Sequence, residues 1–221
     1  MPPSFSEGLC PWQHSGKWGF IDTSGKPAIP FLWDKIYDDF RNGVAIVQKN
    51  GKWGMINKKC EVIAPLTWAE IVPAFNDNSD KDPGLFMVSD GAKWGLIDKQ
   101  GKVVVEPVWD EILAFQGGVF PVRKGGKDRM EISGMGKDRK VEDSGLWGFI
   151  DTNGRVIEQP GRWREVHNFI DGRWQVVESG GTIRNPVNKA LRYQDGRMII
   201  DDTYDKEREE DRRVKTKLEA M

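Results

Sequence analysis

The sequence predicts an all-β protein built from tandem repeats. Two observations predict this fold class: aromatic residues that recur in phase, and turn-forming pairs that separate short apolar runs. The chain has ten tryptophans in 221 residues. Four of them precede a glycine, and the steps between these four are 35, 41 and 53 residues: Trp18, Trp53, Trp94 and Trp147. Fixed steps of this size are typical of structural repeats.

Two further aromatic positions keep phase with the Trp-Gly pairs. A second tryptophan follows 15 or 16 residues later, and a phenylalanine follows that tryptophan after six or seven residues. Three aromatic positions in phase over four copies indicate one structural unit that is repeated. The second tryptophans are Trp33, Trp68, Trp109 and Trp163, and the phenylalanines are Phe40, Phe75, Phe115 and Phe169.

Each unit contains the signals of a β-meander. The apolar run Val44–Val47 is followed by Asn50-Gly51 and then by a second apolar strand with Trp53. Asn-Gly between two apolar runs predicts a hairpin, because both residues tolerate positive φ. A turn that closes with glycine follows, and Asp opens it in three copies, at Asp22, Asp98 and Asp151. A third strand comes next, so we predict three-stranded meanders joined by linkers that carry the second Trp and the Phe.

The Trp-Gly strand is apolar on both faces. Tryptophan and the residue after glycine share one face, and glycine and the following isoleucine share the other, since side chains alternate along a strand. A strand of this kind is covered on both sides. We therefore predict meanders stacked in an open or partly closed curved array. A small β-propeller is the alternative, although its blades have four strands. The glycine is expected to leave room for a neighbouring ring or backbone.

The repeats are expected to form one domain over residues 1–206. Four repeats lie near 16–50, 51–91, 92–144 and 145–186, and a degenerate fifth lies near 187–206. In the fifth copy Lys189 and Ala190 align with Trp and Gly, and terminal repeats are often atypical because they cap an array. Residues 207–221 are dense in charges and are expected to form a short helix or tail.

The repeated pattern resembles a known family. It reads K-W-G-F-I-D-x-x-G-K from Lys17 to Lys26, P-x-x-W-D-x-I from Pro30 to Ile36, and F-x-x-G-x-A-x-V from Phe40 to Val47. This pattern resembles the bacterial WG-repeat family, over roughly residues 16 to 206. The resemblance implies β-rich binding or scaffold modules, and it brings no catalytic residues with it.

The composition narrows the class of partner. The chain has 33 Lys and Arg against 34 Asp and Glu, which argues against a nucleic-acid groove and against an anionic membrane surface. Cys10 and Cys60 form no C-x-x-C pair, which suggests a reducing compartment. The first residues lack the pattern of a secretory signal, and no apolar run is long enough for a membrane helix. We expect a cytoplasmic protein.

No constellation for catalysis stands out in the sequence. His14 and His167 are the two histidines, and neither lies in a Ser-His or Cys-His signature, so a structural or surface role is expected for both. Metal-ligand spacings such as H-x-x-x-H are missing. The recurring aspartates are expected to cap turns. We therefore expect no catalytic residue, no metal site and no cofactor.

Two features are candidates for binding a partner. An insertion takes the place of the fourth hairpin turn, and it is either an elongated hairpin tip or a binding loop. The repeated tryptophans are expected to fill the core, whereas Trp12 and Trp174 are out of phase and are candidates for exposed aromatic contacts. The cations of the insertion are Lys124, Lys127, Arg129, Lys137, Arg139 and Lys140.

The features above favour a non-catalytic scaffold that binds another protein. A specific form of this hypothesis is an immunity or antitoxin-like protein that occludes its partner. The alternative is a module that binds carbohydrate or peptidoglycan through exposed tryptophans. A third hypothesis, an enzyme with an unfamiliar site, requires a cleft in which His14 or His167 meets a carboxylate.

Overall fold

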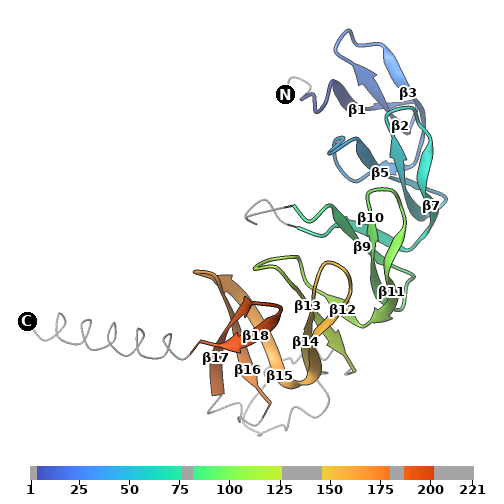
Figure 1. The fold of residues 1–221 in the computed structure, drawn as a ribbon. Coiled ribbons are helices and arrows are strands. Elements are labelled where there is room, and N and C mark those ends of the chain that lie inside the picture. Colours follow the sequence, from blue (N-terminus) through green and yellow to red (C-terminus); the bar gives the residue numbers. More distant parts are fainter. Residues whose placement is uncertain (1–3, 76–81, 126–145, 180–186, 202–221) are drawn as a thin grey trace, which may run out of the picture. The chain divides into compact units, whose positions relative to one another are not determined.

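The computed structural model describes residues 4–75, 82–125, 146–179 and 187–201, and the fold of these residues is all-β (Figure 1). The chain divides into two compact units. Residues 1–77 and 82–109 form unit 1, and residues 110–221 with 78–81 form unit 2. In these described ranges, no helix is long and apolar enough to cross a membrane. The helix or tail expected at 207–221 lies outside them.

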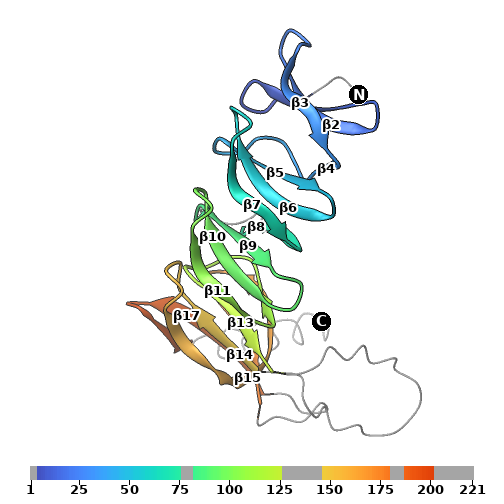
Figure 2. The ribbon, with the colours of Figure 1, turned by 90° about the vertical axis from the view of Figure 1, so that its right-hand side faces the viewer.

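Unit 1 consists of three antiparallel sheets that follow one another along the chain (Figure 2). The first sheet contains β1 (Leu9–His14), β2 (Lys17–Asp22) and β3 (Pro27–Trp33). The second contains β4 (Lys35–Ile36), β5 (Val44–Lys49), β6 (Lys52–Asn57) and β7 (Val62–Trp68). The third contains β8 (Glu70–Pro73), β9 (Leu85–Ser89), β10 (Trp94–Asp98) and β11 (Val103–Trp109).

Unit 2 is one antiparallel sheet of seven strands in chain order. Its strands are β12 (Glu111–Ile112), β13 (Phe120–Lys124), β14 (Leu146–Ile150), β15 (Val156–Ile170), β16 (Arg173–Glu178), β17 (Val187–Gln194) and β18 (Arg197–Ile200). The 15-residue β15 pairs with β14 through its first half and with β16 through its second half. The fourth and fifth meanders therefore share one strand.

The predicted meanders are confirmed, and the linkers add a fourth strand to them. After the second tryptophan the chain passes to the next sheet, where β4, β8 and β12 each pair with the following strand. Strands β4 and β12 could not be predicted from the sequence because they have two residues each. The second and third sheets thus each straddle two of the sequence repeats, and the seven-stranded sheet spans the last three. No sheet of the described residues closes into a barrel. Whether the meanders form an open or partly closed curved array or a small β-propeller stays a prediction.

The two repeated tryptophans lie opposite each other on neighbouring strands. The register pairs Trp18 with Trp33, and the other three repeats contain the same pair. The offset of 15 or 16 residues is therefore the length of the hairpin that joins the two positions. Most of these rings belong to the core, as expected: Trp33, Trp109, Trp147 and Trp163 are buried, and Trp18, Trp53, Trp68 and Trp94 are half-buried.

The glycine after each first tryptophan lets the third strand approach closely. At Gly19 a Cβ atom would lie 2.6 Å from the carbonyl oxygen of Ile29, and at Gly54 it would lie 2.8 Å from that of Ala64. Gly95 and Gly148 face the third-strand backbone at least as closely. The register shifts at each of these places, as in a β-bulge. The expectation that the glycine leaves room for backbone is confirmed.

Neighbouring sheets of unit 1 pack face to face. We call the face of a sheet that packs against the preceding sheet its leading face, and the opposite face its trailing face. In the first sheet, the leading face is the one that carries the residues at the equivalent positions. The trailing face of the first sheet and the leading face of the second form one apolar cluster, with Leu9, Phe20, Ile29 and Trp33 on one side and Phe40, Ala45, Val47 and Ile56 on the other. The second and third sheets repeat this, with Val44, Ile46, Met55 and Ala64 against Ile71, Val88 and Ile97.

The recurring aspartates cap turns, as predicted. The Asp22 carboxylate accepts hydrogen bonds from the backbone N–H groups of Ser24 (2.8 Å) and Lys26 (3.0 Å). Asp98 and Asp151 accept the equivalent pairs in their own turns. In the second repeat, the Asn57 side-chain oxygen does the same. These side-chain oxygens satisfy backbone N–H groups at sharp turns.

The fifth meander differs from its sequence alignment by one residue. The register pairs Val177 with Asn188 and Val176 with Lys189, so the backbone of Asn188 and Lys189 takes the place of Trp and Gly. The following turn explains the shift, because a two-residue Asp195-Gly196 turn with φ of 51° and 78° replaces the longer turn of the other repeats.

The trailing face of the fifth meander is polar. Arg173 and Gln175 stand where the second sheet has Val44 and Ile46. The Asp201 carboxylate accepts hydrogen bonds from the Nε atoms of Arg173 and Arg192, both at 2.6 Å. Paired and buried polar groups thus stand at this face in the places where the second sheet has apolar stacking residues.

Glu158 is a carboxyl group in a place where other repeats have an apolar residue. It lies opposite Phe149, as Ile29 lies opposite Phe20 in the first sheet. Its Oε1 accepts the indole N–H of Trp163 at 2.7 Å. Burial raises the pKa of Glu158, against the opposing effects of Trp163 and of the nearby Arg162. The ionised carboxylate therefore costs unit 2 some stability near neutral pH.

We expect Glu158→Gln to stabilise unit 2 at neutral pH. Glutamine keeps the acceptor for Trp163 and removes the buried charge. A carboxyl group whose pKa is raised by folding lowers stability as the pH rises through that pKa, and has no such effect below its ordinary value of 4.5. Urea unfolding between about pH 4 and pH 8 should show the advantage of the variant growing with pH. Equal stability of the two proteins at all pH values would contradict the assignment.

Two glycines of unit 2 provide a matched test of the bulge. A Cβ atom at Gly148 would collide with the backbone of Glu158 and Pro160, whereas one at Gly161 would meet nothing within 4 Å. We expect Gly148→Ala to lower the free energy of unfolding by about 2 to 3 kcal/mol, as overpacking does. Gly161→Ala should change it by less than about 1 kcal/mol. Comparable losses in both variants, measured by urea unfolding, would contradict this account of the Trp-Gly motif.

Candidate binding groove

The two tryptophans that were candidates for exposed contacts differ in their burial. Trp12 on β1 is 47% exposed, as expected. Trp174 on β16 is 3% exposed, so its predicted exposure was wrong. It lies opposite Leu191 and packs against the rings of Phe149 and Phe169 at 6.2 Å and 5.2 Å. The position of Trp174 relative to the Trp-Gly pairs led to the wrong prediction. The residue belongs to the first strand of its meander, where it takes the place of the buried Ala45.

The predicted binding loop lies largely beyond the described residues. Lys124, at the end of β13, is exposed. The next residue, Gly125, donates its backbone N–H to Asp110 Oδ2 at 2.7 Å. Lys127, Arg129, Lys137, Arg139 and Lys140 lie outside the described residues, so the role of this loop stays a prediction.

The histidines lie at the surface. His14 is exposed and its ring centroid is 5.4 Å from that of Phe31. His167 is half-exposed and its Nε2 is 3.2 Å from a Glu165 oxygen that is itself half-exposed. The described part of the chain holds no group of three or more His, Cys, Asp and Glu side chains suited to a metal ion.

Unit 1 contains a groove between its second and third sheets. It has a volume of about 370 Å³ and is lined from two consecutive linkers and from Lys99 in a turn of the third sheet. The first linker turns tightly through Asn42 and Gly43, whose φ values are 52° and 79°. Backbone hydrogen bonds of 2.9 Å and 3.1 Å between Arg41 and Val44 close this turn. The F-x-x-G motif thus places a phenylalanine just before a rigid hairpin turn.

The groove has an apolar floor and a charged rim. Val44, Ile46 and Leu85 line its base and are buried in the sheets behind it. Aromatic rings border the base, and among them Tyr37 is 48% exposed. A floor of this kind with polar groups around it is the usual anatomy of a protein-binding patch. The other rings are Phe75 and Phe86, and the charged rim comprises Asp38, Asp39, Arg41, Asp82 and Lys99.

The rim is held by contacts between the two linkers. The Arg41 guanidinium lies 5.2 Å from the centre of the Phe75 ring, a cation–π arrangement. Asn42 donates a hydrogen bond of 2.9 Å from Nδ2 to Asp82 Oδ2. Asp82 in turn accepts the Gly84 backbone N–H at 2.7 Å. These contacts fix the two walls relative to each other and leave Tyr37 exposed at the edge.

One carboxyl group of the rim is electrostatically unfavourable. Burial raises the pKa of Asp39, and the adjacent Asp38 carboxylate raises it further. A partner that brings a positive charge to this place would relieve the repulsion between the two carboxylates. The sequence analysis missed the groove, although exposed Tyr37 beside the F-x-x-G motif was a local signal for it.

Comparison with known proteins gives one family. The model of the WG containing repeat family matches residues 18–53, 94–127 and 147–180. The matched segments leave out residues 54–93, where Asn57 replaces the aspartate of the other repeats and Ala69 replaces the aspartate of the first and third, although β6 and β7 pair as their counterparts do. No curated protein and no solved structure matches the chain.

The different burial of the two tryptophans predicts different costs of their removal. We expect Trp174→Ala to lower the free energy of unfolding of unit 2 by about 3 to 5 kcal/mol, as loss of a buried aromatic ring does. Trp12→Ala should cost unit 1 less than about 1 kcal/mol. Urea unfolding in dilute solution tests both, and Ile170→Ala, at a 49% exposed site of unit 2, is the control for a surface truncation. A small loss in Trp174→Ala would contradict its placement in the core.

Proposed function

The chain belongs to the WG containing repeat family, and from this premise we propose that it is a non-catalytic scaffold that binds another protein. The groove of unit 1 carries the proposal. Its volume of about 370 Å³ suits one or two side chains of a partner, and its buried apolar base is ringed by Tyr37, Phe75 and Arg41. Tyrosine, phenylalanine and arginine are the residues enriched at protein interfaces.

The groove is pre-formed, which favours binding. The hairpin turn at Asn42-Gly43, the Asn42–Asp82 hydrogen bond and the Arg41–Phe75 contact hold its walls through interactions within the chain. A partner that enters a pre-formed site loses less free energy to ordering than one that must shape its site. We propose that the partner inserts an apolar side chain next to a basic one, because the rim carries Asp38, Asp39 and Asp82.

An immunity or antitoxin-like role is a specific form of this proposal, in which the bound protein is a toxin that the scaffold occludes. The carbohydrate-binding alternative has less support. It relies on regularly exposed tryptophans to stack on sugar rings, whereas Trp12 is the one tryptophan of the ten that is exposed. All ten lie in the described residues.

Site-specific photocrosslinking tests the proposal. A photoreactive phenylalanine analogue at position 37 should crosslink to a defined partner in the lysate of the native host. The same analogue at Val62, which is 52% exposed in unit 1 and does not line the groove, is the matched control. Mass spectrometry of the crosslinked band then names the partner, and a toxin would establish the immunity form.

Substitutions in the groove provide a second test of the proposal. Tyr37→Ala and Arg41→Ala together should weaken binding of the identified partner about 30-fold or more, as loss of interface hot spots does. Crosslinks of equal yield from positions 37 and 62, or none from either, would contradict a protein-binding groove. A thermal shift with a small-molecule library but no protein crosslink would identify the groove as a small-molecule site.

A further inference from the structure

The leading face of the first sheet is built like the faces that join neighbouring sheets. Trp12 lies opposite Gly19, and the same place is taken by Val47 opposite Gly54 in the second sheet and by Val88 opposite Gly95 in the third. Both valines are 0% exposed, because each packs against the preceding sheet. Trp12 is 47% exposed. The equivalence extends to β13, where Val122 lies opposite Gly148.

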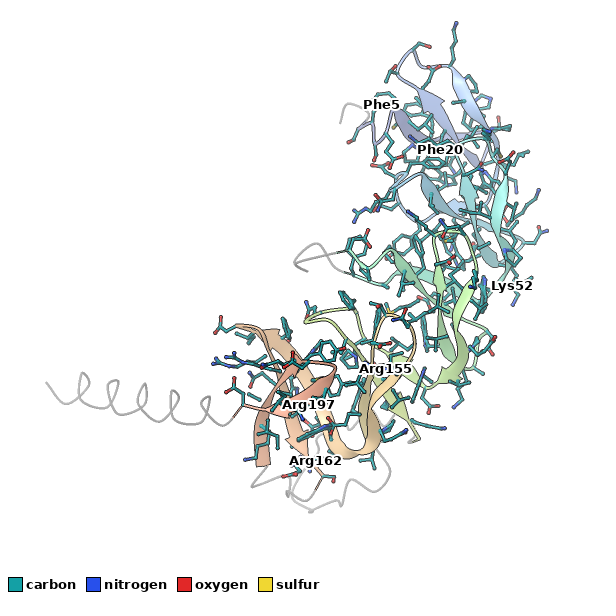
Figure 3. The ribbon with its side chains drawn as sticks, viewed as in Figure 1. Phe5, Phe20, Lys52, Arg155, Arg162 and Arg197 are labelled. Carbon is teal, nitrogen blue, oxygen red and sulfur yellow. The ribbon has the colours of Figure 1, made fainter. Side chains whose placement is uncertain are left out.

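The segment before β1 repeats the linker motif. Phe5-Ser6-Glu7-Gly8 corresponds to Phe40-Arg41-Asn42-Gly43, with the same backbone bridge closing the turn, from Ser6 to Leu9 and from Arg41 to Val44. Phe40 is 0% exposed in the cluster between two sheets, where its ring centre is 4.6 Å from that of Phe20. Phe5 is 36% exposed, at the N-terminal edge of the first sheet (Figure 3).

The remaining side chains of this face are also apolar or aromatic. A Cβ atom at Gly19 would lie 2.8 Å from the Phe31 ring, so this ring covers the glycine, as Leu66 covers Gly54 in the second sheet. Leu66 packs into the cluster between the first and second sheets. Cys10 and Ile21 complete the face at 5% and 9% exposure. An inter-sheet surface is thus present, and its bulkiest residue, Trp12, is exposed on the edge strand β1.

We propose that this leading face docks a second copy of the chain, face to face, with Trp12 at the centre of the contact. The surface continues an established kind of interface, since the same positions are covered by a sheet in the second and third meanders. Large aromatic residues at the centre of an apolar patch are typical anchors of a dimer. A two-fold contact buries both tryptophans and closes on itself.

A head-to-tail contact is disfavoured by the other end of the chain. Within the array a leading face covers a trailing face. The trailing face of the fifth meander carries Arg173 and Gln175 in place of Val44 and Ile46. Arg173 is already 8% exposed, and Ala190, which lies opposite Gln175, is 2% exposed, so this face offers no open apolar surface to Trp12. A two-fold contact between two leading faces is therefore favoured over a head-to-tail contact.

Light scattering coupled to gel filtration tests this proposal on the full chain. We expect a mass of twice 25.1 kDa at high micromolar concentration, and dissociation on dilution. The dimer should persist in high salt, since its contact is apolar. Trp12→Val restores the residue of the other sheets and should fold, while it weakens dimerisation about 30-fold or more. Val108→Ala, at a 48% exposed site of β11, should leave the dimer unchanged.

Tryptophan fluorescence provides a second readout, which detects formation of the dimer contact directly. Burial of Trp12 in the pair should shift the Trp emission to the blue as the concentration rises, and Trp12→Phe should remove this dependence on concentration. A single-chain mass at every concentration overturns the proposal, and so does a dimer that survives Trp12→Val. Either outcome leaves the groove around Tyr37 untouched, so the two proposals fail separately.

Discussion

The close approach of the third strand to the Trp-Gly strand is the constraint on which the first four meanders depend. Because the glycine has no side chain, the backbone of the third strand passes directly over it and places the second tryptophan opposite the first. The paired indoles then form the wall of the core that the next sheet covers. A side chain at the glycine would push the third strand outward, part the two tryptophans and uncover the contact between sheets.

The hairpins and capped turns could be predicted because their signals are local, such as Asn50-Gly51 and Asp22. The strands β4 and β12 could not, since two residues become a strand only when the next hairpin supplies a partner. The same limit explains Trp174. Counted from the Trp-Gly pairs it is out of phase, but counted along the sheet it takes the place of Ala45 and points inward. The sequence repeats and the sheets have different boundaries. The burial of a residue therefore follows from its position in the sheet and not from its position in the sequence repeat.

The candidate surfaces follow from the same geometry. Tyr37 and Phe86 are far apart in the chain, and they border one groove because successive linkers lie at the same end of adjacent sheets. A single sequence shows each linker but not their juxtaposition. The leading face of the first sheet is likewise an ordinary inter-sheet surface with a tryptophan in place of a valine. The groove forms between the linkers, and the leading face belongs to the sheet. The same kind of repeat therefore provides both surfaces.

The shared strand β15 has a consequence for how the chain is divided by unfolding and by deletion. At Asp34, Ala69 and Asp110 the backbone bends away to start a new sheet, whereas it continues through Arg164 without leaving its sheet. Removal of either of the last two meanders would leave half of β15 without hydrogen-bond partners. These two meanders therefore form one cooperative block that is gained or lost whole through its backbone, whereas the earlier sheets are joined by the side chains packed between them.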